Sequence, residues 1–165
     1  MKFKVEPKNG KIQIDQSGKI EDTAKDTVLA LSDDIKYTVI LSAKTKRTLQ
    51  SILRREGRPG MFVYLVFSSL LYLLLKSVQP KSKVIVDKEY PGKEDLVKLI
   101  IKRIIQKEGA EGKLNFEFGL VGKSSNAHGL AHKTYKKKLK ANKKVKFEEV
   151  IRLIYLIKND RVSRY

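Results

Sequence analysis

Residues 11–42 read KIQIDQSGKIEDTAKDTVLALSDDIKYTVILS, and this region sets the expected architecture. It holds three short runs that either alternate between apolar and polar positions or are rich in β-branched residues: 11–15, 27–31 and 37–42. The turn signals Gln-Ser-Gly and Ser-Asp-Asp follow the first and second runs. The pattern therefore predicts three antiparallel strands at the start of a sheet.

Helical and strand-like segments alternate in the rest of the chain. The expected segments are a basic helix at 44–58, an apolar helix at 61–75, a strand at 83–87, an amphipathic helix up to Gly109, a strand at 114–121, and helices at 125–141 and 147–159. The order β-β-β-α-β-α-β-α with an extra C-terminal helix predicts an α/β fold, a mixed sheet with helices on both faces. We expect a single domain over 1–165 that ends in a basic helical segment at 125–160.

The charge of the chain is strongly positive and unevenly spread. Lysine and arginine number 36 against 18 aspartates and glutamates, which gives a formal net charge of +18. Residues 1–34 are close to neutral, whereas 133–146 hold eight lysines and no acid. Such self-repulsion is relieved when a polyanion binds, because counterions leave its phosphates. The charge favours nucleic acid as a partner; the alternative is a solvated, solubility-promoting surface.

The composition also indicates where in the cell the protein is expected and whether its apolar helix enters a membrane. The chain has no cysteine, which excludes disulfides and thiol chemistry, and its N-terminal residues lack the apolar segment of a signal peptide, so we expect a cytoplasmic protein. The apolar run at 61–75 falls short of the ~20 residues that span a bilayer, so we expect no membrane insertion. The helix is predicted either to be buried in the core or to be covered in part by a second copy in a homodimer.

Two aspartates end strand-like runs that lie far apart in the sequence. Asp15 ends the first strand and Asp87 ends the fourth. Ligand sites in α/β sheets gather outside the carboxyl ends of the strands, so the two carboxylates converge if these strands are neighbours. Like charges that close require a cation, and carboxylate oxygens suit Mg²⁺ or Mn²⁺. The alternative is that Asp15 caps a local turn and Asp87 only begins a loop.

The two histidines of the chain form a second feature. His128 and His132 lie four residues apart, hence on one face of a helix that residues 124–126 (Ser-Ser-Asn) can cap. A zinc site is disfavoured because no glutamate stands between the histidines and the chain has no thiol. The alternative for each histidine is solvation in a basic helix.

Together these residues resemble the RNase H-like nuclease superfamily. Asp15 in IQIDQSG, Asp87 in KVIVDKE and His128 in AHGLAHK take the places of its metal ligands, and the set is similar to the Asp-Asp-His arrangement of the Argonaute/Piwi branch. The resemblance implies two Mg²⁺ or Mn²⁺ ions, with Asp15 bridging them and His128 completing one shell. It also implies hydrolysis of a phosphodiester bond that leaves a 5′-phosphate.

The chain departs from the family pattern at one carboxylate. Many relatives carry a glutamate on the helix after the third strand, and the apolar helix has none. Glu56, just before that helix, is one candidate for the missing ligand; Glu89 and Glu94, in the loop after the fourth strand, are the others. The alternative for all three is a surface charge.

The sequence thus predicts a metal-dependent nuclease. The diffuse basic charge favours single-stranded DNA as the substrate, with RNA as the other substrate, and we further expect exonuclease action. The alternative is a non-catalytic, basic nucleic-acid-binding or architectural protein, which explains the charge but not the aspartates and the histidine. Eight basic residues are expected to hold the phosphate backbone. They are Arg54, Arg55, Arg58, Lys133, Lys136, Lys137, Lys138 and Lys140.

Overall fold

The computed structural model describes residues 12–32, 35–110 and 115–160, and within them six strands form one mixed sheet in the order β5-β4-β1-β2-β3-β6. Strands β1, β2 and β3 form an antiparallel meander, while β4 pairs in parallel with both β1 and β5. The strands are β1 Ile12–Ser17, β2 Thr27–Ser32, β3 Lys36–Leu41, β4 Val84–Asp87, β5 Phe116–Gly119 and β6 Lys143–Lys144. The predicted α/β class and the five longer strands are confirmed, and the topology is consistent with an RNase H-like fold.

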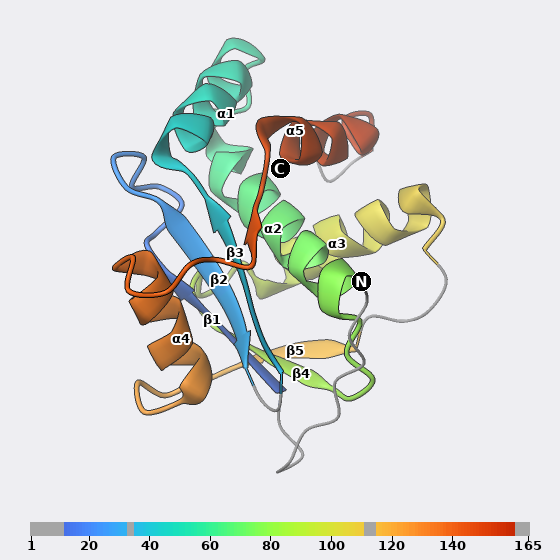
Figure 1. Cartoon of the computed structure of the whole chain (residues 1–165). Coiled ribbons are helices and arrows are strands. Elements are labelled where there is room, and N and C mark those ends of the chain that lie inside the picture. Colours follow the sequence, from blue (N-terminus) through green and yellow to red (C-terminus); the bar gives the residue numbers. More distant parts are fainter. Residues whose placement is uncertain (1–11, 33–34, 111–114, 161–165) are drawn as a thin grey trace.

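Helices cover both faces of this sheet, as the sequence predicts (Figure 1). Helix α4 packs on one face against β1, β2 and β3, whereas α2 packs on the other against β2 and β3. Helices α3 and α5 lie against α2, and α1 joins α2 and α5 at one end. The helices are α1 Ala43–Arg55, a 3₁₀ turn Pro59–Met61, α2 Phe62–Val78, α3 Glu94–Glu108, α4 Asn126–Tyr135 and α5 Phe147–Leu156.

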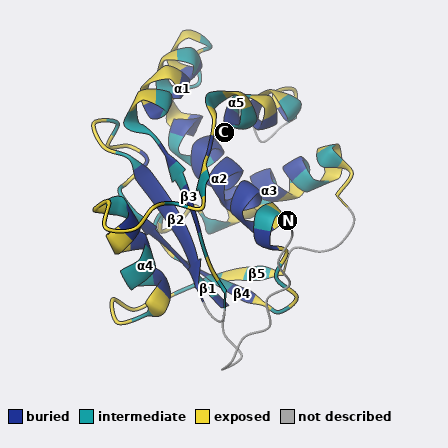
Figure 2. Ribbon diagram, viewed as in Figure 1, coloured by how far each residue is buried: buried dark blue, intermediate teal, exposed yellow. Residues whose placement is uncertain are grey.

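Helix α2 is the core of the helical layer. Together with the preceding 3₁₀ turn it forms an apolar stretch, Pro59–Val78, that by length and composition alone could cross a membrane. However, 78% of its most apolar window is buried within the chain, where side chains of α3, α5 and the sheet surround it (Figure 2). Thirteen residues of α2 are buried in this way. The homodimer contact expected through 61–75 stays a prediction.

The lysine-rich region differs from the expected continuous helix. The helix predicted over 125–141 ends at Tyr135, and Lys137 adopts a left-handed backbone with φ 61°. The chain then follows the open edge of β3: Asn142 Oδ1 accepts hydrogen bonds from the Thr38 backbone N–H and hydroxyl, and the Val145 N–H donates to the Ile40 carbonyl. The prediction of helix over 125–141 was thus wrong beyond Tyr135, where the chain turns and then satisfies its backbone groups on the edge strand β3.

The basic helix predicted over 44–58 is also shorter than expected. It ends at Arg55, and Gly57 follows with φ 74°, a conformation that glycine adopts at little cost. Pro59 then begins the 3₁₀ turn that leads into α2. The break turns the chain from α1, which is buried on one side only, into the buried helix α2.

Candidate metal centre

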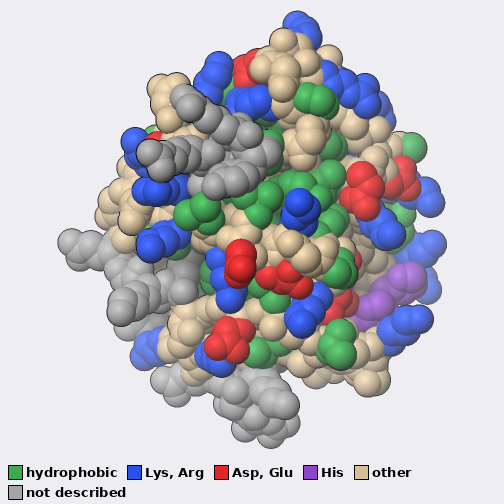
Figure 3. Space-filling model, turned by 180° about the vertical axis from the view of Figure 1, so that it is seen from behind, with side chains coloured by type: hydrophobic (Ala, Val, Ile, Leu, Met, Phe, Trp, Pro, Cys, Tyr) green, Lys and Arg blue, Asp and Glu red, His purple; other side chains and the backbone are tan. Residues whose placement is uncertain are grey.

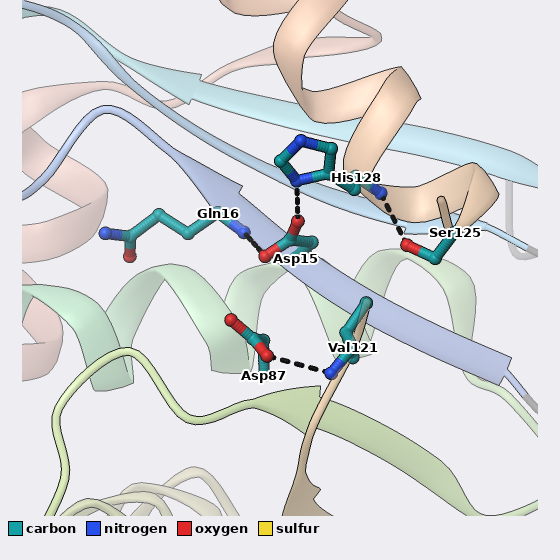
Figure 4. A network of polar contacts seen from close by, with 6 residues as sticks. All are labelled: Asp15, Gln16, Asp87, Val121, Ser125 and His128. Carbon is teal, nitrogen blue, oxygen red and sulfur yellow. Dashed lines mark hydrogen bonds and ion pairs between the residues drawn. The ribbon is translucent and has the colours of Figure 1, made fainter. Parts of the chain in front are cut away.

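Two strand ends bring Asp15 and Asp87 together. β1 and β4 are parallel neighbours in which Ile14 pairs with Val86, so the next residues of both strands, the two aspartates, lie in one row. Figure 4 shows their side chains side by side at the carboxyl ends of the two strands. Asp15 is only 3% exposed, whereas Asp87 is half-buried. The strands that carry the two aspartates are therefore neighbours, which is what the expected convergence of the two carboxylates requires.

A third carboxylate, Glu89, joins the pair. Immediately after β4 the backbone turns, with the Glu89 N–H donating to the Asp87 carbonyl at 2.9 Å. The turn returns the Glu89 side chain toward Asp87, and one oxygen each from Asp15, Asp87 and Glu89 lies within 4.8 Å of the others. We call these three residues the acidic triad. Of the candidates proposed for the missing carboxylate, Glu89 is therefore the one that the fold brings to the aspartates.

The electrostatics of the acidic triad favour a bound cation. Burial, and then the negative charges of Asp15 and Asp87, raise the pKa of Glu89 to about 8. A carboxyl group with that pKa holds a proton at neutral pH when no metal is present. A divalent cation among the three groups offsets their repulsion, and oxygen ligands are the ones that Mg²⁺ and Mn²⁺ prefer. The donor set thus fits the expected metal.

His128 lies directly beside the acidic triad. It is in the first turn of α4, where its N–H donates to the side-chain oxygen of Ser125, the N-cap, at 3.0 Å. Its Nδ1 lies 2.7 Å from Asp15 Oδ2, and the other oxygen of Asp15 accepts the Gln16 N–H at 2.9 Å (Figure 4). Both oxygens of Asp15 are therefore oriented by neighbours. The role of His128 as a metal ligand stays a prediction, since its contact is with Asp15 itself.

The loop after β5 orients Asp87 in a similar way. The Val121 N–H donates to Asp87 Oδ1 at 2.9 Å, and the Lys88 N–H donates to the Gly119 carbonyl at 3.2 Å. These two bonds tie the segment between β5 and α4 to the end of β4, and Figure 4 shows the one between Val121 and Asp87. Val121 was not among the residues singled out from sequence, because a backbone donor carries no residue-type signal.

Tyr90 anchors the loop that carries Glu89. Its hydroxyl accepts a hydrogen bond from Gln16 Nε2 at 3.1 Å, and its ring packs edge-on against Tyr64 and Phe67. Burial raises the pKa of Tyr90 well above its ordinary value, so the hydroxyl stays neutral. The residue next to Glu89 is thereby fixed on the core, which limits the freedom of the triad's third member.

Glu56, another candidate for the missing carboxylate, lies in a different cluster. It follows α1, and its carboxylate accepts hydrogen bonds from Arg58 Nη2 at 2.7 Å and the Tyr155 hydroxyl at 2.8 Å. Lys158 of the α5 end lies 3.6 Å away. Burial alone would raise the pKa of Glu56, but the bonds from Arg58 and Tyr155 lower it below its ordinary value. Glu56 thus joins α1 to α5 and is not part of the acidic triad.

The predicted phosphate-binding residues are distributed over two regions. Lys133 lies on α4, beyond His128, and the four lysines after it on the exposed turn that follows this helix; Arg54 and Arg55 are exposed at the end of α1. Arg58 is held by Glu56, with its side chain 13% exposed. Figure 3 shows the two histidines on one face of the molecule with lysine or arginine side chains beside them. The four lysines are Lys136, Lys137, Lys138 and Lys140.

The arrangement provides three carboxylates and one imidazole at the carboxyl ends of neighbouring strands, on an α/β sheet with basic side chains nearby. Such a donor set can hold a metal ion next to a bound phosphate. Comparisons of the chain with protein-family models, with curated proteins and with solved structures found no match.

Proposed function

We propose that this protein is a metal-dependent nuclease that hydrolyses phosphodiester bonds at the acidic triad. The observation that carries the proposal is the convergence of Asp15, Asp87 and Glu89 within 4.8 Å, beside His128, at one edge of a sheet with RNase H-like topology. Three carboxylates this close repel one another and destabilise the fold when no cation is bound. The pKa of Glu89, raised to about 8, reflects burial together with this repulsion.

The carboxylates, His128 and the basic side chains have different roles in this proposal. The triad carboxylates hold Mg²⁺ or Mn²⁺, with Asp15 and Asp87 as the primary ligands. When bound, the metal supplies an activated water and stabilises the leaving oxygen. His128 holds Asp15 through its Nδ1 and is the group placed to complete a metal shell or to carry a proton. Basic side chains near the triad bind the phosphate backbone without reading sequence.

The favoured substrate is single-stranded DNA, cut from an end, with RNA as the second choice. Support comes from the net charge of +18 and from the lysines that are exposed after α4. Backbone contacts of this kind are independent of base identity. A substrate strand that reaches the triad therefore binds by charge first and is positioned by the residues around the metal.

The test is cleavage of end-labelled single-stranded DNA and RNA with Mn²⁺, with and without a chelator. The wild-type protein is expected to cleave only with the metal, and Asp15→Asn and Asp87→Asn are each expected to lower the rate more than ~100-fold, since even outer-shell changes at metal sites cost 10–100-fold. Asp95→Asn, an exposed acid in the first turn of α3, is the matched control and is expected to retain activity.

The rival function, a non-catalytic nucleic-acid-binding protein, is favoured by the same charge. It predicts binding that needs no metal and no cleavage of any substrate. Equal binding by the wild type and both asparagine variants, with no product in Mn²⁺, would support non-catalytic nucleic-acid binding and contradict nuclease activity.

A further inference from the structure

A large apolar side chain stands exposed beside the metal centre. Leu120 is 87% exposed, against 45% for Leu139 and for Tyr155, the other large hydrophobic side chains exposed in the described segments. Single exposed leucines are common on protein surfaces, so exposure alone assigns no role. The position of Leu120 is what distinguishes it.

Leu120 is held between two residues that are tied to the end of β4. Before it, the Gly119 carbonyl accepts the Lys88 N–H; after it, the Val121 N–H donates to Asp87 Oδ1. Val121 is 7% exposed, so its side chain points into the protein while Leu120 points out. Because consecutive Cα atoms are ~3.8 Å apart, Leu120 is one residue from the group that orients a triad aspartate. The backbone on both sides of the exposed leucine is thus held at the end of β4.

Exposed polar residues follow Leu120 on the same loop. Lys123 and Ser124 are both exposed, and they lead directly into Ser125, which caps α4 below His128. The loop therefore carries an exposed apolar side chain and an exposed ammonium group three residues apart, on the segment that binds Asp87 through the Val121 N–H. A polynucleotide offers the complementary pair, since each unit carries one flat, apolar base face and one phosphate.

Base faces are accessible only in an unpaired strand, because stacking covers them in a duplex. A leucine packed on a base face gains from burial of apolar area whichever base is present. Lys123 can bind a phosphate of the same strand as a point charge. This combination distinguishes single strands from duplexes without selecting a sequence.

We propose that Leu120 packs on an unpaired base next to the phosphate at the metal centre, with Lys123 on the adjoining phosphate, and that together they position a single strand for cleavage. The proposal rests on the proposed function for the class of substrate. Leu120 is in this account a positioning residue, which changes where and how tightly the strand binds.

The first test measures binding of a fluorescent single-stranded DNA that contains 2-aminopurine, with Ca²⁺ in place of Mn²⁺. Leu120→Ala is expected to weaken binding about tenfold, the effect of losing one buried leucine contact, and to abolish the change in 2-aminopurine fluorescence. Leu139→Ala removes the same side chain from the lysine-rich turn and is expected to change binding less than twofold. Neither variant is expected to change duplex binding, and their melting temperatures should match the wild type.

The second test removes the base instead of the leucine. A strand with one abasic site at the contacted position is expected to raise KM about tenfold for the wild type and to leave Leu120→Ala unchanged, because the two deletions remove the same contact. If Leu120→Ala binds and cleaves like the wild type, the positioning role is overturned while the nuclease stands.

The proposed function can also fail while the role of Leu120 holds. Single-strand binding that depends on Leu120, with no cleavage in Mn²⁺, would contradict nuclease activity and support the contact between Leu120 and a base. A wild type that does not bind single strands overturns both. An equal loss of binding to single strands and duplexes in Leu120→Ala would also contradict the inference, since a duplex offers no base face.

Discussion

Several effects act on the pKa of Glu89 in the same direction. Burial, the charge of Asp15 and the charge of Asp87 all raise its pKa, which reaches about 8. An unfolded glutamate has its ordinary pKa of 4.5, so between these values the folded metal-free protein binds more protons than the unfolded chain. The stability of the metal-free protein should therefore fall as the pH rises from about 4.5 to about 8.

The variant Glu89→Gln tests this electrostatic account. It removes the charge but keeps the shape, so in chelator at pH 8.5 it is expected to melt several degrees above the wild type, given that ~1 kcal/mol moves the midpoint of a chain this size by roughly 2–4 °C. The difference should shrink toward pH 5, where the wild-type Glu89 is neutral. Thermal unfolding by circular dichroism across this range measures it.

With Mn²⁺ added, the wild type should melt above Glu89→Gln, because only the wild type retains all three carboxylates and is stabilised by metal binding. Glu94→Gln, in the first turn of α3, is the control and should follow the wild type. Parallel pH profiles for the wild type and Glu89→Gln would mean that Glu89 is not coupled to the two aspartates.

Part of this site could be predicted from sequence, because it depends on local pattern. Asp15 and Asp87 both end apolar runs, which places them at the ends of strands. Glu89 was only one of three candidates, because it reaches Asp87 through a turn after β4. The choice between Glu89 and Glu56 could not be made, since it depends on α1 packing against α5. The backbone contacts to Asp15 and Asp87 from Gln16 and Val121 had no sequence signal at all.

At the scale of elements, one buried lysine joins α1 to the loop between β1 and β2. Lys46 is 0% exposed, and its ammonium group donates to the carbonyls of Lys19 and Asp22 and to the Thr27 hydroxyl. All three of its protons are thus used. Burial lowers the pKa of Lys46 to about 8, which three acidic neighbours oppose. The contact holds the loop that follows Asp15.

Replacement of this lysine should destabilise the fold. Lys46→Met keeps the apolar stem but leaves two carbonyls and a hydroxyl without their donor, at a cost of about 1–3 kcal/mol for unsatisfied buried groups. Urea unfolding should show a lower midpoint with an unchanged slope. Lys44→Met, which removes an exposed lysine of the same helix, should have little effect. Equal midpoints for the two variants would contradict the role assigned to Lys46.

The elements themselves were predicted well where periodicity is strong. β1, β2, β3 and the apolar helix α2 follow from alternation, β-branching and length. The helix predicted over 125–141 ends early, at Tyr135, and the chain that follows it reaches β3, about 100 residues earlier, which takes up Lys143 and Lys144 as a two-residue strand. A strand that short carries no pattern of its own.

At the scale of the whole molecule, a strongly basic chain surrounds a small acidic centre. The net charge of +18 attracts a polyanion, while the acidic triad repels it unless a cation is bound. Metal binding and substrate binding are therefore expected to support each other. This coupling is the property that a solvated basic surface alone does not have.

The salt dependence of single-strand binding tests the role of the basic surface. Each neutralised phosphate contributes roughly −0.7 to the slope of log affinity against log salt. Removal of three lysines after α4 is expected to make the slope less steep by about two, as measured by fluorescence anisotropy in Ca²⁺. An unchanged salt dependence would mean that the single strand does not bind at these lysines. The replaced residues are Lys136, Lys137 and Lys138, and the control triple replaces Lys76, Lys102 and Lys107, which are exposed on α2 and α3.

Binding of a divalent metal by the acidic triad can be seen directly by anomalous diffraction from crystals grown with Mn²⁺. We expect an anomalous peak among the carboxylates of Asp15, Asp87 and Glu89, at roughly 2.0–2.2 Å from their oxygens, as is usual for small divalent cations. The peak should be absent from Asp15→Asn crystals grown in the same way. Wild-type crystals in millimolar Mn²⁺ with no peak between these three side chains would contradict the account.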